Sequence, residues 1–118
     1  MEFKIRRATK DDMPRVLELI QELATFEKEP DAVEVTINQL KEDGFSGHPD
    51  FICFVAETTE QVEGMALIYQ RYSTWKGKII HLEDLIVNQE MRGSGIGTAL
   101  LDKVIQYGKA KGVKRISW

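Results

Sequence analysis

The sequence has few of the residues that build metal centres or disulfide frameworks. Its 118 residues include one cysteine, Cys53, and two histidines, His48 and His81. One cysteine excludes a disulfide within the chain and a cysteine-based zinc site, and two histidines exclude a histidine-rich metal cluster. We therefore expect no metal, and we interpret Cys53 as a small buried side chain in a strand.

No apolar run approaches the length of a membrane-spanning helix. The longest runs, such as Met65 to Ile68, fall far short of the roughly 20 residues that such a helix needs. The N-terminus carries charges at Glu2, Lys4, Arg6 and Arg7 around no apolar core, so it does not resemble a signal peptide. These observations predict a cytoplasmic protein.

The sequence also lacks a large excess of charge of either sign. Its 16 basic and 19 acidic residues give a net charge of -3. Nucleic acid usually requires a basic face, so this charge argues against it as the main partner and leaves room for a cationic substrate. The content of 42% hydrophobic and 30% charged residues is typical of one globular domain, which we expect to cover residues 1–118.

Hydrophobic periodicity predicts eight elements, in the order strand, helix, helix, strand, strand, strand, helix, strand. The crossover through the last helix predicts a parallel strand pair, and the shorter connections before it predict antiparallel pairs. The fold class is therefore α/β, with a mixed, mostly antiparallel sheet flanked by helices. The expected strands cover residues 3–6, 51–57, 62–72, 78–87 and 113–118, and the expected helices cover residues 13–24, 36–44 and 97–111.

Helix-start signals support two of these helices. Thr9 or Asp11 can cap the first helix, and Pro14 fits its first turn. Thr36 and Gln39 have the spacing of a capping box, which predicts the start of the second helix. We expect Gly44 to end that helix.

The most informative stretch is Arg92-Gly93-Ser94-Gly95-Ile96-Gly97-Thr98, which follows a predicted strand and opens a helix. Its glycines let the backbone approach a ligand closely, and the free N–H groups of the helix start favour an anion such as a pyrophosphate. A Walker loop would end in Gly-Lys-Ser/Thr, and a dinucleotide fingerprint would have glycine at position 98 and follow the first strand. Neither pattern fits.

The pattern Arg-x-x-Gly-x-Gly, formed by Arg92, Gly95 and Gly97, resembles that of the Gcn5-related N-acetyltransferases (the GNAT superfamily). The element order agrees with the GNAT fold. Further stretches resemble the branch of spermidine/spermine N1-acetyltransferases, which includes enzymes acting on thialysine. They are Glu22-Leu23-Ala24, Glu42-Asp43-Gly44-Phe45, His81-Leu82-Glu83-Asp84-Leu85, and the turn with Trp75 and Gly77.

The resemblance implies transfer of an acetyl group from acetyl-CoA to a primary amine of a small molecule, by direct attack in a ternary complex. It assigns Glu83 as the base, acting through water, and leaves Asp84 to bind a second ammonium group or orient a neighbour. Adjacent strand residues point to opposite faces, so we expect only one of the two carboxylates to face the substrate.

The resemblance also implies the binding residues. The backbone of Leu85, Ile86 and Val87 contacts the pantetheine arm, and Gly93, Ser94, Gly95, Ile96, Gly97 and Thr98 hold the pyrophosphate of coenzyme A. Arg92 either pairs with a phosphate or orients the loop. For the amine, the resemblance implies contacts with Phe26 and Glu27, although Glu27 also fits an ordinary solvated loop. Trp75 either covers the substrate channel or serves as a packing or dimer residue. Polyamine enzymes of the branch carry an aspartate where this chain has Ser73, which puts strict polyamine selectivity in doubt.

The resemblance makes two further expectations. In the family a helix and two strands follow the last strand found here, and they carry a tyrosine that protonates the departing thiolate; no residue of this chain matches it. We therefore expect a C-terminal segment to be missing, and we expect a homodimer. Two alternative functions stay open: an acyl-CoA-binding remnant without turnover, and acetylation of a protein lysine or N-terminus.

Overall fold

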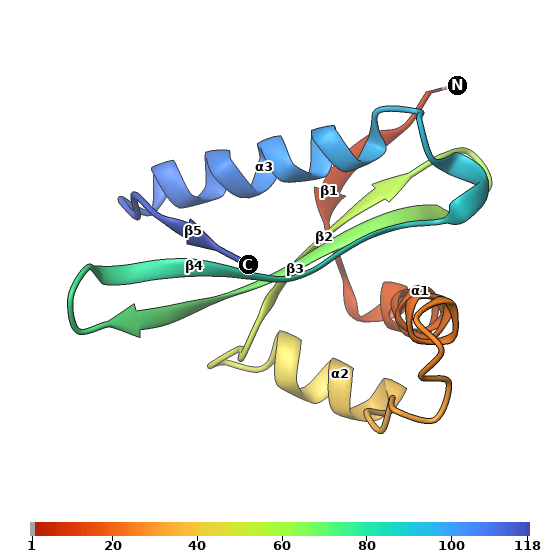
Figure 1. Cartoon of the computed structure of the whole chain (residues 1–118), viewed down its shortest axis with the longest axis horizontal. Helices are drawn as coiled ribbons and strands as arrows, with labels where there is room; N and C mark the ends of the chain where they lie inside the picture. The colour runs from red at the N-terminus through yellow and green to blue at the C-terminus, as the bar shows by residue number, and fades with distance from the viewer. Residues whose placement is uncertain (1) are drawn as a thin grey trace.

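The computed structural model describes residues 2–118, which form a five-stranded sheet with helices on both faces (Figure 1). The sheet order follows the chain order, and each neighbouring pair is antiparallel except the last, which is parallel. This arrangement confirms the mixed, mostly antiparallel sheet. Its strands are β1 (Lys4–Arg7), β2 (Ile52–Glu57), β3 (Val62–Ser73), β4 (Gly77–Val87) and β5 (Ile116–Ser117).

Three helices cover the two faces of the sheet (Figure 1). Helices α1 (Met13–Phe26) and α2 (Ile37–Phe45) lie on one face, and α3 (Ile96–Ala110) lies on the other. Two short 3-10 turns, η1 (Lys10–Asp12) and η2 (Gln89–Met91), precede α1 and α3. The loop that holds the glycines therefore lies between the end of β4 and the start of α3.

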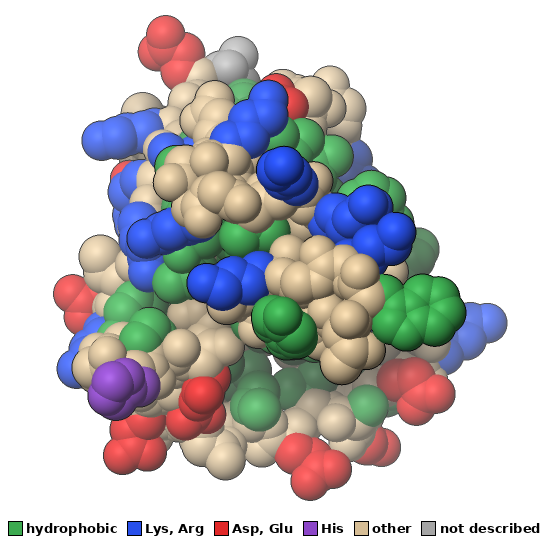
Figure 2. All heavy atoms as spheres, turned by 90° about the vertical axis from the view of Figure 1, so that its left-hand side faces the viewer, with side chains coloured by type: hydrophobic (Ala, Val, Ile, Leu, Met, Phe, Trp, Pro, Cys, Tyr) green, Lys and Arg blue, Asp and Glu red, His purple; other side chains and the backbone are tan. Residues whose placement is uncertain are grey.

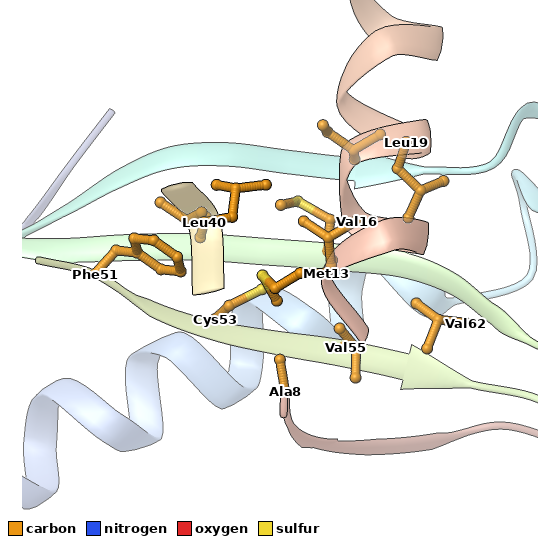
Figure 3. Packing of buried hydrophobic residues seen from close by; sticks show 12 residues of the cluster. Ala8, Met13, Val16, Leu19, Leu40, Phe51, Cys53, Val55 and Val62 are labelled. Carbon is orange, nitrogen blue, oxygen red and sulfur yellow. The ribbon is translucent and has the colours of Figure 1, made fainter. Parts of the chain in front are cut away.

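Both faces of the central strands are apolar, so the molecule has two cores. The core under α1 and α2 includes Met13, Val16 and Leu19 from α1 and Cys53 and Val55 from β2 (Figure 3). Alternate residues of the same strands face α3 on the opposite side. The prediction that Cys53 is buried is confirmed, and this burial raises the pKa of its thiol to about 12.

The capping box is confirmed, because the backbone N–H of Gln39 donates to the Thr36 Oγ at 3.1 Å and the Thr36 N–H donates to the Gln39 Oε1 at 2.9 Å. Pro14 lies in the first turn of α1 as expected. The prediction that Gly44 ends α2 is wrong. Gly44 lies inside the last turn, where a Cβ atom would collide with the Phe51 ring.

The last strand is shorter than predicted. Residues 113–118 were expected to be extended, but only Ile116 and Ser117 pair with β4. Val113 is buried in the core against α3, and its N–H donates to the carbonyl of Gly108 at the end of α3. This contact holds the chain close to the helix end before the strand begins.

Candidate active site

The glycine loop opens α3 in the way that the sequence predicts. Gly95 is the residue before the helix, with a left-handed backbone at φ 90°, and Gly93 has φ 82°. A side chain is strained in this conformation, which glycine adopts freely. A Cβ atom at either position would meet no heavy atom within 4 Å. The backbone at the start of this 15-residue helix is therefore open to an approaching anion.

A hollow of about 550 Å³ lies in front of this loop. Two residues of the predicted cofactor site do not line it. Ile86 is buried in the core on the α1 side, and the Ser94 hydroxyl donates to the carbonyl of Met91 within the loop. The predicted residues that do line it are Leu85, Val87, Arg92, Gly93, Gly95, Ile96, Gly97 and Thr98.

Arg92 connects the glycine loop to the end of α1. Its guanidinium lies 5.5 Å from the centroid of the Phe26 ring, a cation–π distance. Phe26 remains 59% exposed. The structure thus brings one residue predicted for the amine site against one predicted for the cofactor site.

A buried ionic network around Glu63 of β3 holds the chain where β4 ends and the segment leading to the glycine loop begins. Glu63 of β3 is 7% exposed, and its carboxylate accepts from Arg15 at 3.1 Å and from the Asn88 side chain at 3.0 Å. The Asn88 N–H also donates to the Glu63 carbonyl at 2.8 Å. Because Asn88 follows β4 directly, the network fixes where the chain leaves the sheet. The sequence analysis missed these residues, since no local pattern pairs positions so far apart.

Glu83 and Asp84 lie at a β-bulge in β4. Leu67 of β3 pairs with Asp84, and the next β3 residue pairs with Leu82, so Glu83 has no partner in β3. Such a bulge re-aims side chains and increases the local bend. The bulge interrupts the alternation of side chains along β4. The expectation that Glu83 and Asp84 point to opposite faces depends on that alternation.

The two carboxylates share the face covered by α1 and α2. Tyr69 pairs with His81 and Leu67 pairs with Asp84, and the two β3 residues are two positions apart, so their partners face the same side. A Glu83 carboxylate oxygen lies 3.6 Å from the His81 Nε2, on that same side. The bulge thus removes the strict alternation that the expectation assumed, and the expectation that only one carboxylate faces the substrate stays a prediction.

Asp84 has the perturbed electrostatics typical of a functional site. Burial raises the pKa of its carboxyl group, and the nearby charges of Glu83 and Glu27 raise it further. Glu27 directly follows α1, so this interaction places it near the β4 bulge. The structure thus gathers three predicted acidic residues where an ammonium group would relieve their repulsion.

A second hollow lies along β4, next to the β4–β5 pair. Of the described residues, only Ile80 and His81 of β4 pair with β5. Beyond them a hollow of about 300 Å³ is lined by Leu82, Glu83, Leu85, Leu101 and Trp118. Leu85 also lines the hollow of the glycine loop. This one residue therefore adjoins both the glycine loop and the Glu83 carboxylate.

Trp75 is not brought into this site within one chain. It lies in the turn between β3 and β4 and is 90% exposed. Glu83 is six residues along β4 from Gly77, which corresponds to roughly 20 Å of strand. The Ser73 hydroxyl accepts from the N–H groups of Trp75 and Lys76, so it holds this turn together.

Charge is unevenly distributed on the end of the molecule that carries the β3–β4 turn. Figure 2 shows Lys and Arg side chains gathered over its upper part, towards α3, and Asp and Glu side chains over its lower part, towards α2. Exposed residues of these regions include Lys109, Lys111 and Lys114 at the end of α3, and Glu42 and Asp43 on α2. These basic residues lie at the C-terminal end of α3, the opposite end from the glycine loop.

Residues 2–118 contain neither a candidate membrane-spanning helix nor a candidate metal cluster. No helix of this range has both the length and the apolar character needed to cross a membrane. No group of three or more histidine, cysteine, aspartate or glutamate side chains in the same range is placed to hold a metal ion.

Comparisons with known proteins agree with this architecture. The model of the acetyltransferase (GNAT) family matches residues 13–118. Thialysine N-epsilon-acetyltransferase of Bos taurus is 40% identical over 120 residues, which cover 95% of this chain and 71% of that protein. Spermidine/spermine N(1)-acetyltransferase-like protein 1 of Homo sapiens is 40% identical over 111 residues, which cover 88% of this chain but 16% of that protein.

Solved structures show the same fold at lower sequence identity. Glucosamine-6-phosphate N-acetyltransferase from Arabidopsis thaliana has a TM-score of 0.78 at 21% identity, covering 98% of this chain and 80% of that one. An aminoglycoside acetyltransferase from a soil metagenomic sample has a TM-score of 0.77 at 21% identity, covering 97% and 74%. Fold and relatives together define an N-acetyltransferase. The chain belongs to the acetyltransferase (GNAT) family.

Proposed function

We propose that this protein transfers an acetyl group from acetyl-CoA to a primary amine of a small molecule, a polyamine or a thialysine-like diamine. The observation that carries this proposal is that Leu85 lines both the hollow of the glycine loop and the hollow that Glu83 lines. The first hollow suits a pyrophosphate, and the carboxylate of the second suits an ammonium group. We propose that both substrates are bound together and that the amine attacks directly.

The glycine loop holds the pyrophosphate in this proposal. Its left-handed glycines and the open space above them let phosphate oxygens reach the free N–H groups of α3. In this proposal the backbone of Leu85 to Val87 pairs with the pantetheine arm as with a strand.

Glu83 acts as the base. An alkylammonium has a pKa near 10.4, and only the neutral amine attacks a carbonyl carbon. Glu83 accepts a proton from the ammonium through a water molecule. The neutral amine then adds to the thioester carbonyl carbon and forms the C–N bond, and the C–S bond breaks as the carbonyl re-forms. Coenzyme A leaves as a thiolate, and the second proton that the attacking nitrogen releases converts it to the thiol. Asp84, Glu27 and Phe26 bind the cationic acceptor, because carboxylates attract its charge and an aromatic ring can line its stem.

The choice of acceptor follows from the relatives and from Ser73. Two relatives are named for thialysine and for spermidine/spermine, which are both cationic amines. The Ser73 hydroxyl is used inside its turn and supplies no anionic partner for a long polycation. We therefore favour a short diamine. The proposal includes a cytoplasmic protein and a homodimer, in which Trp75 would reach the site of the second copy.

An acceptor comparison tests the proposed function. The chain is incubated with acetyl-CoA and, separately, thialysine, spermidine and a lysine-containing peptide, and acetylated products are quantified by mass spectrometry. We expect thialysine to give the highest kcat/KM. Acetylation of the peptide alone would show that the acceptor is a protein. Binding of acetyl-CoA without any product would favour a coenzyme-binding protein without turnover.

A further inference from the structure

We propose that His81 is a positioning residue that directs the Glu83 carboxylate towards the acceptor amine. This inference rests on the proposed function, because Glu83 is the base only in that proposal. It starts from three contacts that draw β3, β4 and β5 together around one imidazole ring. His81 stands in a stretch that resembles the branch, but the resemblance assigns it no role.

The ring is held from two sides. Its Nδ1 lies 2.8 Å from the Ser117 Oγ of β5, and the Tyr69 ring of β3 lies beside it with the centroids 5.1 Å apart and the planes tilted by 49°. Arg71 of β3 donates to the same Ser117 Oγ at 3.4 Å. The hydrogen bond and the neighbouring aromatic ring together hold the imidazole in the orientation that the structure shows.

That orientation aims the second ring nitrogen at Glu83. The distance from the His81 Nε2 to the Glu83 Oε1 is 3.6 Å, and the His81 side chain is 23% exposed against 53% for Glu83. When the Ser117 hydroxyl donates to Nδ1, the neutral ring carries its proton on Nε2 and presents it to the carboxylate. A small movement of Glu83 completes the hydrogen bond.

The place of the His81–Glu83 contact in the sheet shows why the Glu83 carboxylate needs support there. His81 and Ser117 form the last β4–β5 pair among the described residues, directly before the hollow that Glu83 lines. Glu83 is the unpaired bulge residue, so no cross-strand neighbour in β3 fixes its side chain. A long, half-exposed carboxylate without such support samples many rotamers. His81 supplies the missing support at the point where the reacting groups would meet.

Four variants test the inference through acetyl transfer from acetyl-CoA to thialysine and to spermidine. General base catalysis contributes roughly 10²–10⁴-fold, and a misdirected base loses part of that factor. We expect His81→Phe to lower kcat about thirtyfold with the KM for the amine changed less than threefold. His81→Gln places an amide nitrogen near the Nε2 position, and we expect it to retain kcat within about fivefold. Ser117→Ala should fall between these two.

The control is His48→Gln, which changes the other histidine of the chain, in an exposed turn. Thermal unfolding followed by circular dichroism shows whether each variant is folded. A kcat for His81→Phe within twofold of the unsubstituted chain would overturn the inference, and so would an equal loss in His81→Gln. If the unsubstituted chain transfers no acetyl group, the proposed function itself fails.

Nitrogen NMR of the imidazole gives a readout that does not depend on turnover. The inference predicts that the neutral His81 ring carries its proton on Nε2. It further predicts that Ser117→Ala changes this tautomer preference. A ring protonated on Nδ1 in the unsubstituted chain would contradict the inference.

Discussion

At the scale of single residues, the site depends on one bulge in β4. Glu83 is the extra residue, and its presence turns two successive carboxylates to the same face. The consequence is a division of roles. Glu83 is exposed and near the hollow between β4 and β5, whereas Asp84 is more enclosed and closer to Glu27. One carboxylate is suited to exchange protons with water, and the other to bind charge.

The assignment of Glu83 as the base predicts a large effect of removing its charge. We expect Glu83→Gln to lower kcat by roughly 10²–10⁴-fold, the range that general base catalysis contributes. Steady-state kinetics with acetyl-CoA and the best acceptor amine measure the effect. The control is Glu60→Gln, in the exposed turn between β2 and β3. A Glu83→Gln variant that retains full kcat would remove Glu83 from the mechanism.

The raised pKa of Asp84 predicts a pH dependence of stability. The folded chain holds the Asp84 proton more tightly than the unfolded chain, so ionising this carboxyl group costs stability and the cost is greatest above its folded pKa. Asp84→Asn should therefore raise the urea midpoint at pH 7. The gain should shrink as pH falls and vanish below about pH 3.9, the ordinary aspartate value.

Asp31→Asn, on the exposed loop before α2, is the control for the Asp84 variant. We expect its urea midpoint to stay unchanged at pH 7. A gain for Asp84→Asn that persists undiminished at low pH would contradict the electrostatic explanation.

At the scale of secondary-structure elements, the sequence predicts those features that depend on contacts between residues close together in the chain. The capping box at Thr36 and the glycines before α3 were predicted because each is a hydrogen-bond or backbone requirement of adjacent residues. The bulge at Glu83 and the shortened β5 were not predicted. They depend on the β3 register and on Val113 packing against α3, and these involve contacts between distant residues. For the same reason His81 and Ser117 gave no joint signal.

Gly95, the glycine before α3, predicts that an alanine substitution can change acetyl-CoA affinity separately from the free energy of unfolding. Gly95 and Gly112 both have left-handed backbones, with φ 90° and 73°, and neither has a heavy atom within 4 Å of a built Cβ. Alanine at either position should cost roughly 1–2 kcal/mol of unfolding free energy. Only Gly95→Ala should also weaken acetyl-CoA binding, by about tenfold, because only Gly95 lies in the cradle. Equal loss of affinity in both variants would contradict this role.

The close packing of α3 against the sheet at Gly64 predicts that a larger residue there lowers stability. A Cβ atom at Gly64 would lie 2.8 Å from the Ile96 Cγ2 and 3.2 Å from the Leu100 Cδ1, so alanine there forces α3 outward. We expect Gly64→Ala to cost about 1–3 kcal/mol, as overpacking typically does. Gly47→Ala, with no heavy atom within 4 Å, should stay within about 0.5 kcal/mol. Urea denaturation measures both, and equal midpoints would contradict the tight contact.

At the scale of the whole molecule, the sheet separates two kinds of binding chemistry. The glycine loop opens α3 on one face of the sheet, and Asp84, with Glu27 acting on its charge, lies on the face covered by α1 and α2. The arrangement suits an anionic coenzyme on one side and a cationic amine on the other, with the β4 edge between them. The fold class and element order were predictable from hydrophobic periodicity. The placement of the glycine loop and the carboxylates beside the same stretch of β4 was not, because it depends on how the strands pair.

Calorimetric titration of the chain with acetyl-CoA tests the central claim most directly, because the glycine cradle must hold coenzyme A before any transfer can occur. The account predicts saturable binding with one site per chain and a loss of affinity in Gly95→Ala but not in Gly112→Ala. Absence of binding to the folded chain, or binding that Gly95→Ala leaves unchanged, would contradict it.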